Sequence, residues 1–184
     1  GDKSGRRVLI VCEGGETEPG YFAALKRNLR LPGVTILGKE VGPAPINVVD
    51  SAIDARRAGQ RSREPYDAVW CVFDRDSHSS FAQAVDKARS NKLRIAISVP
   101  CFEFWLLLHY EYTSRPCDDF DDLRKNKLAI HLPDYDKAQT DWDQVLSGLE
   151  RAKSHAERLR RSQEHEPEHT NPSTNVDELV TYLE

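Results

Sequence analysis

The chain has 184 residues, of which 39% are hydrophobic and 30% are charged, and its formal net charge is −4 at pH 7. This composition excludes a disordered or fibrous protein and predicts a soluble globular protein with a core that needs no disulfide bonds. The negative net charge argues against indiscriminate coating of nucleic acid, although it leaves local contact open. No apolar run approaches the roughly 20 residues that a membrane-spanning helix needs, so we expect no membrane association through such a helix.

Apolar β-branched runs alternate with helical periodicity along the first 110 residues. Four runs predict strands: Val8 to Cys12, Val34 to Leu37, 68 to 73, and Arg94 to Ser98. A helical stripe follows each run: from about Pro19, Ile46 to Arg57, Phe81 to Ser90, and Phe102 to His109. Strands that are apolar throughout predict an α/β protein with a mainly parallel sheet of about four strands and helices on both faces, Rossmann-like in layout.

The pattern changes after residue 110. A charged loop at 118 to 123 runs into a short helix, and a long amphipathic helix is predicted from Asp143 to Arg161. A polar loop then leads to a last helix, Val176 to Leu183, for which Thr174 is the expected cap. We therefore expect one domain over residues 1–184, with an α/β core at 1–110 and a helical C-terminal extension at 111–184 packed on it.

The cysteines and the N-terminal residues indicate the cellular compartment in which the protein is expected. The four cysteines have no zinc-binding spacing, and two of them lie inside apolar strand-like runs: Cys12, Cys71, Cys101 and Cys117. We expect all four to be reduced thiols in a cytoplasmic protein. The N-terminal segment GDKSGRR is polar and predicts no signal peptide.

Acidic side chains follow three of the four predicted strands. Glu13 follows the first strand, Asp74 and Asp76 end the third, and Glu103 comes shortly after the fourth. In an open parallel sheet, ligands bind beyond the carboxyl ends of the strands, and neighbouring strands lie about 4.8 Å apart. Residues two apart in an extended segment point the same way, so Asp74 and Asp76 share a direction. Clustered carboxylates suit Mg²⁺ or Mn²⁺ and would repel one another without a cation.

Each of these residues has a simpler interpretation when it is taken alone. Asp76 or Ser77 could cap the following helix, Glu18 could favour the positive end of its own helix, and Glu103 could pair with an arginine. The glycines of CEGGETEPG, at 12 to 20, could serve only the turn, because no phosphate-binding glycine motif is present. Taken together at one edge of the sheet, the carboxylates favour a metal site.

Four blocks in this order resemble the RloB-like family of bacterial proteins: VLIVCEGGETEPGYFAAL, AVWCVFDRDSH, SVPCFEFWLLLHYE and NPSTNVDELVTYL. That family is similar to the Toprim fold group, which implies a Toprim-like sheet here. The Toprim pattern implies Glu13, Asp74 and Asp76 as metal ligands, with Glu13 also as general acid and base. The blocks of the family add Glu18 as a further catalytic carboxylate and Glu103 as a supporting residue of the site. Most members have Asn-Pro where this chain has Val99-Pro100.

The resemblance implies a role in bacterial defence against phage through abortive infection, beside an ABC-like ATPase partner or a restriction system. Related Toprim proteins are Mg²⁺-dependent nucleases. The leading hypothesis is a nuclease that uses Mg²⁺ or Mn²⁺ to cut DNA or RNA, with tRNA as one candidate substrate. His78 and Lys137 would contact phosphate, although each could instead be a solvated loop residue.

Two other hypotheses remain open. In a phosphohydrolase of the HAD-like kind, Asp74 would be a covalent nucleophile and Asp76 the acid. That motif normally follows the first strand, and this interpretation leaves CEGGETE unexplained. The third hypothesis is a non-catalytic module that senses a signal or docks on the ATPase.

Overall fold

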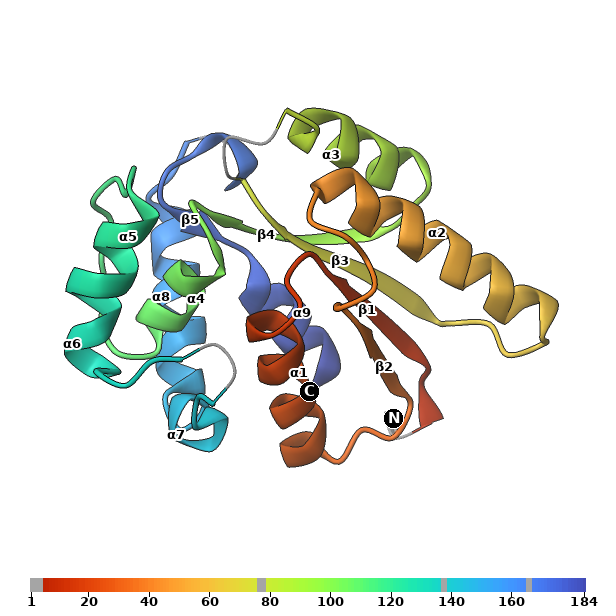
Figure 1. The fold of residues 1–184 in the computed structure, drawn as a ribbon, viewed down its shortest axis with the longest axis horizontal. Helices are drawn as coiled ribbons and strands as arrows, with labels where there is room; N and C mark the ends of the chain where they lie inside the picture. The colour runs from red at the N-terminus through yellow and green to blue at the C-terminus, as the bar shows by residue number, and fades with distance from the viewer. Residues whose placement is uncertain (1–4, 76–78, 137–138, 165–166) are drawn as a thin grey trace. The chain divides into compact units, whose positions relative to one another are not determined.

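A computed structural model describes residues 5–75, 79–136, 139–164 and 167–184 (Figure 1). Its five-stranded sheet has the order β2-β1-β3-β4-β5. The strands are β1 Val8–Cys12, β2 Val34–Leu37, β3 Ala68–Asp74, β4 Arg94–Val99 and β5 Ser173–Thr174. β1 pairs in parallel with β2 and β3, whereas β4 and β5 are antiparallel. The predicted α/β class with a mainly parallel sheet, flanking helices and C-terminal helices is confirmed, and the short fifth strand was not predicted.

The chain divides into two compact units, which are described separately below. The first unit is built from the described parts of 1–73, 77–96 and 182–184, and the second from those of 74–76 and 97–181. None of the helices in the described part of the chain is long and apolar enough to cross a membrane.

In the first unit, β1 is the central strand and all five of its residues are buried. Its register sets Val8 opposite Val34 on one side and Ala68 on the other. Three helices cover these strands: α1 Thr17–Leu29, α2 Pro45–Arg61 and α3 Phe81–Ser90. Figure 1 shows α2 and α3 side by side along one side of the strands and α1 on the other. Right-handed crossovers produce this division, because the connection from β1 to β2 and the connection from β2 to β3 run in opposite directions across the sheet.

In the second unit, helix α4 is the centre of the core. All seven residues of α4, Phe102–Leu108, are buried, and α4 packs against α8, Leu149–Arg161. Shorter segments complete the unit: α5 Phe120–Asp122, η2 Leu123–Leu128, α6 Ala129–His131, α7 Trp142–Leu146 and η3 Pro167–His169. The last helix, α9, spans Val176–Leu183. Thr174 lies in β5, and its hydroxyl oxygen accepts a hydrogen bond from Val176 N (3.3 Å). The guanidinium of Arg160 binds both carboxylate oxygens of the buried Asp177 (2.7 and 2.6 Å) and so joins α8 to α9.

The single long helix predicted for 143–161 is wrong, because two helices, α7 and α8, occupy this segment. Asp141 caps α7 by accepting a hydrogen bond from Gln144 N (3.2 Å). The break falls at Gly148, where a Cβ atom would lie only 2.4 Å from the carbonyl oxygen of His109. The amphipathic pattern continues across the break, so periodicity alone did not reveal it.

The contact at Gly148 predicts a large loss of stability in Gly148→Ala. The new Cβ must push the His109 carbonyl away, and the displaced atoms belong to backbone rather than to a flexible side chain. We expect the free energy of unfolding to fall by about 2 kcal/mol, measured by urea denaturation. Gly5→Ala is the matched control, because nothing lies within 4 Å of the Cβ atom added there. Equal midpoints and slopes for the two variants would contradict the prediction.

His109 makes the stability of the protein depend on pH. Its ring is fully buried, and its Nδ1 donates a hydrogen bond to the carbonyl of Trp105 (2.9 Å). Burial lowers the pKa of His109 from 6.5 to about 4, while the hydrogen bonds to the Trp105 and Leu106 carbonyls oppose this shift. Between pH 6.5 and about 4, His109 is therefore protonated in the unfolded state and neutral in the folded state. This contribution to stability is complete above pH 6.5 and is lost as the pH falls toward 4, at a cost of about 3 kcal/mol.

The pH dependence can be measured directly. The ring of His109 should titrate below pH 5 in an NMR titration, and a value near 6.5 would contradict the assignment. In His109→Gln, the loss of unfolding free energy between pH 7 and pH 5 should be smaller than in the parent protein. The exposed His169 serves as the control, since His169→Gln should keep the parent slope.

Candidate metal centre

The first unit carries the turn that follows β1. The backbone N–H of Glu13 donates to the carbonyl of Val72 (3.0 Å), so the pairing of β1 with β3 continues one residue past the strand. Glu13 itself is half-buried. Glu13 therefore lies directly after the carboxyl end of β1, as the sequence predicts.

Glu18 lies against this turn. It is the second residue of α1 and only 7% exposed, and its place in the first turn suits the positive end of the helix. A Cβ atom on Gly14 would come within 1.9 Å of Glu18 Oε2, so only glycine lets this carboxylate lie where it does. Burial raises the pKa of the Cys12 thiol, and the negative charges of Glu18 and Cys71 raise it further. The Glu18 carboxylate thus adjoins the end of β1, in the same unit as Glu13.

The end of β2 closes the other side of the turn. A Cβ atom on Gly38 would lie 2.4 Å from Pro19 Cγ and 2.9 Å from the carbonyl oxygen of Gly14. The glycines at 14 and 38 therefore permit close approach between the turn and its neighbours. Within CEGGETEPG it is therefore Gly14 that permits the close packing and places a carboxylate, whereas a Cβ atom on Gly15 would make only an ordinary contact.

The second unit carries Asp74 and the residues around it. Asp74 is the last residue of β3 and is half-buried. Arg75 is held twice: its backbone N–H donates to the carbonyl of Ser98 (3.1 Å), and its Nη1 donates to the carbonyl of Glu168 (2.6 Å). These bonds fix the backbone directly after Asp74. Three predicted site residues lie outside the described residues: Asp76, His78 and Lys137.

Glu103 lies in the first turn of α4 and is 6% exposed. Tyr135 donates its phenolic O–H to Glu103 Oε1 (3.3 Å). Burial raises the pKa of the Cys101 thiol, and the negative charges of Glu103 and then Asp74 raise it further. Both carboxylates therefore lie near this thiol, and Glu103 and Asp74 belong to one unit.

Two residues of this region were not predicted from the sequence. Glu168 is buried (4% exposed) in η3, the turn whose carbonyl binds Arg75. Tyr135 reaches Glu103 from the segment after α6. Both stand in polar stretches without periodicity, so the sequence contained no signal that would have identified them.

The donor chemistry fits a hard divalent cation. Glu13, Glu18 and Asp74 offer carboxylate oxygens, which are the ligands that Mg²⁺ prefers. Among the described residues no group of three His, Cys, Asp or Glu side chains stands close enough together to hold a metal ion. Asp76 falls outside that set, and Glu13 and Asp74 belong to different units.

The strand order is that of an open, doubly wound α/β sheet. An open, mostly parallel sheet ordered 2-1-3-4-5 reverses direction between β1 and β3, and such folds bind ligands at the carboxyl ends of those two strands. Glu13 follows β1 and Asp74 ends β3. A family model described as RloB-like protein matches residues 8–183, and the chain belongs to this family. No match was found among curated proteins or among solved structures.

Proposed function

We propose that this protein is a metal-dependent nuclease that hydrolyses phosphodiester bonds in DNA or RNA, with tRNA as one candidate substrate. The observation that carries the proposal is the strand order, since it assigns Glu13 and Asp74 to the two strands between which the sheet reverses. Membership of the RloB-like family supports it through the resemblance of that family to Toprim proteins. We further propose that the protein is a toxic effector in defence against phage and acts with an ATPase partner.

In this proposal Glu13, Asp74 and Asp76 hold Mg²⁺ or Mn²⁺. The cation would supply stabilisation of the charge that develops on the scissile phosphate. Glu13 takes a proton from the attacking water as the oxygen of that water bonds to phosphorus. As the bond between phosphorus and the leaving oxygen breaks, a solvent water gives a proton to the leaving oxygen. Glu18 adds negative charge beside the turn that carries Glu13, and Gly14 gives it the room to do so. Glu103, held by Tyr135, supports the Asp74 side.

The test combines metal binding with cleavage on the same samples. Calorimetric titration with Mg²⁺ and Mn²⁺ should show binding to the parent protein and not to Asp74→Ala/Asp76→Ala. Plasmid DNA and total tRNA are then incubated with each protein, with and without a chelator. Metal-dependent strand scission that the double variant lacks would support the nuclease and identify its substrate. Release of phosphate from a small phosphomonoester without scission would favour a phosphohydrolase, and the absence of metal binding would contradict the proposal.

A further inference from the structure

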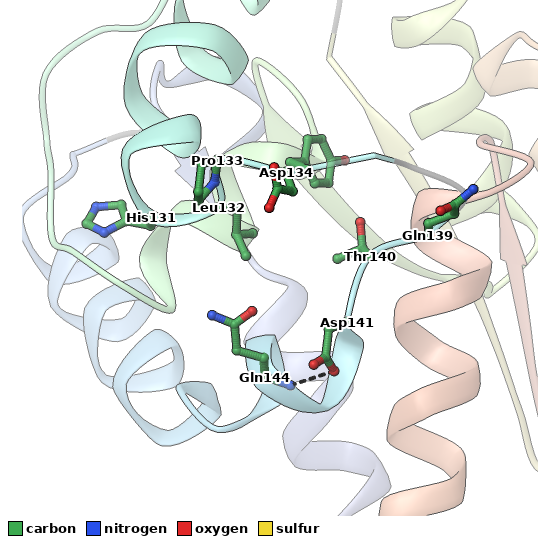
Figure 2. A pocket seen from close by; sticks show the side chains of 9 residues that line it. His131, Leu132, Pro133, Asp134, Gln139, Thr140, Asp141 and Gln144 are labelled. Carbon is green, nitrogen blue, oxygen red and sulfur yellow. Dashed lines mark hydrogen bonds between the residues drawn. The ribbon is translucent and has the colours of Figure 1, made fainter.

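The second unit contains a pocket of about 350 Å³ outside the carboxylates discussed above. Its walls are formed by residues of 131–135, at and after the end of α6, and by residues of 139–144, at and before the start of α7 (Figure 2). This volume lies within the range of pockets that bind small organic groups, which begins near 300 Å³. The lining is in part apolar, because it includes Leu132, Pro133 and Tyr135.

Two polar groups face the pocket and are available to a ligand. Figure 2 shows Asp134 and Gln144 on opposite sides, with the ends of both side chains directed into the space between them. Within the described part of the chain, neither the Asp134 carboxylate nor the Gln144 carboxamide forms a side-chain hydrogen bond or ion pair with the protein. Among the other polar residues of the lining, Thr140 donates to the carbonyl of Asp136 and Asp141 accepts from Gln144 N. Figure 2 shows the Gln139 side chain directed away from the space between Asp134 and Gln144.

At one end of the pocket, the side chain of His131 is fixed by two contacts. His131 Nε2 lies 2.7 Å from Glu111 Oε2, and the His131 ring stacks on Tyr110 with centroids 5.0 Å apart. At another wall, Tyr135 is fixed by its hydrogen bond to Glu103. A site whose walls are held by contacts of their own binds with less loss of conformational entropy.

We propose that this pocket binds a guanine base of the nucleic-acid substrate, an inference that rests on the proposed nuclease function. The Watson–Crick edge of guanine presents two adjacent N–H donor groups, N1–H and N2–H₂, and beside them the acceptor O6. A carboxylate takes the two donors in parallel, as Asp134 is placed to do, and the Gln144 amide can donate to O6. Unpaired bases are commonly bound in this way, with the ring against an aromatic or apolar wall such as Tyr135 or Leu132.

The same groups discriminate against the other bases. Adenine and cytosine each present one donor group beside a ring acceptor, and that acceptor would face the Asp134 carboxylate. Uracil and thymine present one N–H between two carbonyl oxygens, which the carboxylate repels. Tyr135, which lines the pocket, donates a hydrogen bond to Glu103 (3.3 Å), so the pocket adjoins the residue that the proposal assigns to the support of Asp74.

Nucleoside binding tests the pocket without any requirement for cleavage. Guanosine, inosine, adenosine, cytidine and uridine are titrated into the ¹⁵N-labelled full chain and followed by NMR. We expect guanosine to shift signals of the pocket residues, including the Gln144 side-chain amide. Inosine, which lacks only the N2 amino group, should bind at least about tenfold more weakly, which corresponds to the loss of one charge-assisted hydrogen bond.

Asp134→Asn should weaken guanosine binding at least about tenfold, because an amide offers one acceptor where the carboxylate offers two. Asp143→Asn removes the same charge from the exposed side of α7 and should bind guanosine like the parent. Equal binding of all five nucleosides, no guanosine binding, or unchanged binding by Asp134→Asn would overturn the proposal. Guanosine binding by a protein that cuts no nucleic acid would support the guanine pocket and contradict the proposed nuclease function. Cleavage of nucleic acid without guanosine binding would support the nuclease and contradict the guanine pocket.

Discussion

Replacing Asp74 by Asn is expected to reduce metal-dependent strand cleavage by about three orders of magnitude, because a bound cation supplies several kcal/mol of charge stabilisation in the transition state. The substitution keeps the size of the side chain and removes the charge that would hold the cation at the end of β3. The overall fold should be preserved, because the half-buried side chain keeps its shape. The measurement is the initial rate of cleavage over a range of Mn²⁺ concentrations, together with the affinity for Mn²⁺.

Asp67→Asn is the matched control for Asp74→Asn. Asp67 is exposed directly before the same strand, and its Oδ2 accepts a hydrogen bond from Arg7 N (2.8 Å), which an amide oxygen can also accept. We expect this variant to cut at the parent rate. If Asp74→Asn cuts at the parent rate with saturating metal, Asp74 is not a metal ligand and the proposed centre fails.

Gly14→Ala is expected to lower cleavage by about tenfold to a hundredfold while changing the free energy of unfolding little. The added Cβ would overlap the carboxylate of Glu18, which must swing away from the turn. The displaced atoms are the tip of a flexible side chain, so the cost in stability is small. The cost in activity follows from the loss of a carboxylate at its proper position, because catalysis tolerates little misplacement.

The neighbouring glycine provides the control for this experiment. A Cβ atom on Gly15 would meet only Lys39 Cα at 3.7 Å, which is an ordinary contact. Gly15→Ala should therefore retain the parent cleavage rate. Cleavage and urea denaturation are measured for both variants and for Glu18→Gln. Equal activity of Gly14→Ala and Gly15→Ala would show that the position of Glu18 does not matter for the reaction.

The strands were predictable because burial on both faces requires an apolar residue at nearly every position of the strand. The runs at 8–12 and 34–37 match β1 and β2 at both ends, and the last helix matches α9. Such segments are apolar at every position or at every helical repeat, and each pattern depends only on neighbouring residues. The positions of Glu13 and Asp74 at strand ends followed from the same patterns.

The errors fall where a distant segment decides the local conformation. The predicted helix at 143–161 breaks at Gly148 because the His109 carbonyl, some 40 residues earlier, occupies the space that a side chain would need. Strand β5 is only two residues long and exists because Ser173 and Thr174 pair with Val99 and Ser98. A pairing partner far along the chain leaves no periodic signal in so short a segment.

The sequence by itself determined the α/β class, the order of the main elements, and which acidic residues stand at the ends of strands. These properties depend on local burial and periodicity. Only the tertiary structure decided that Glu18 lies over Gly14, that Tyr135 binds Glu103, and that Asp134 and Gln144 face one pocket. Each of those contacts depends on the path of the backbone between its partners, which folding sets through the packing of the whole core.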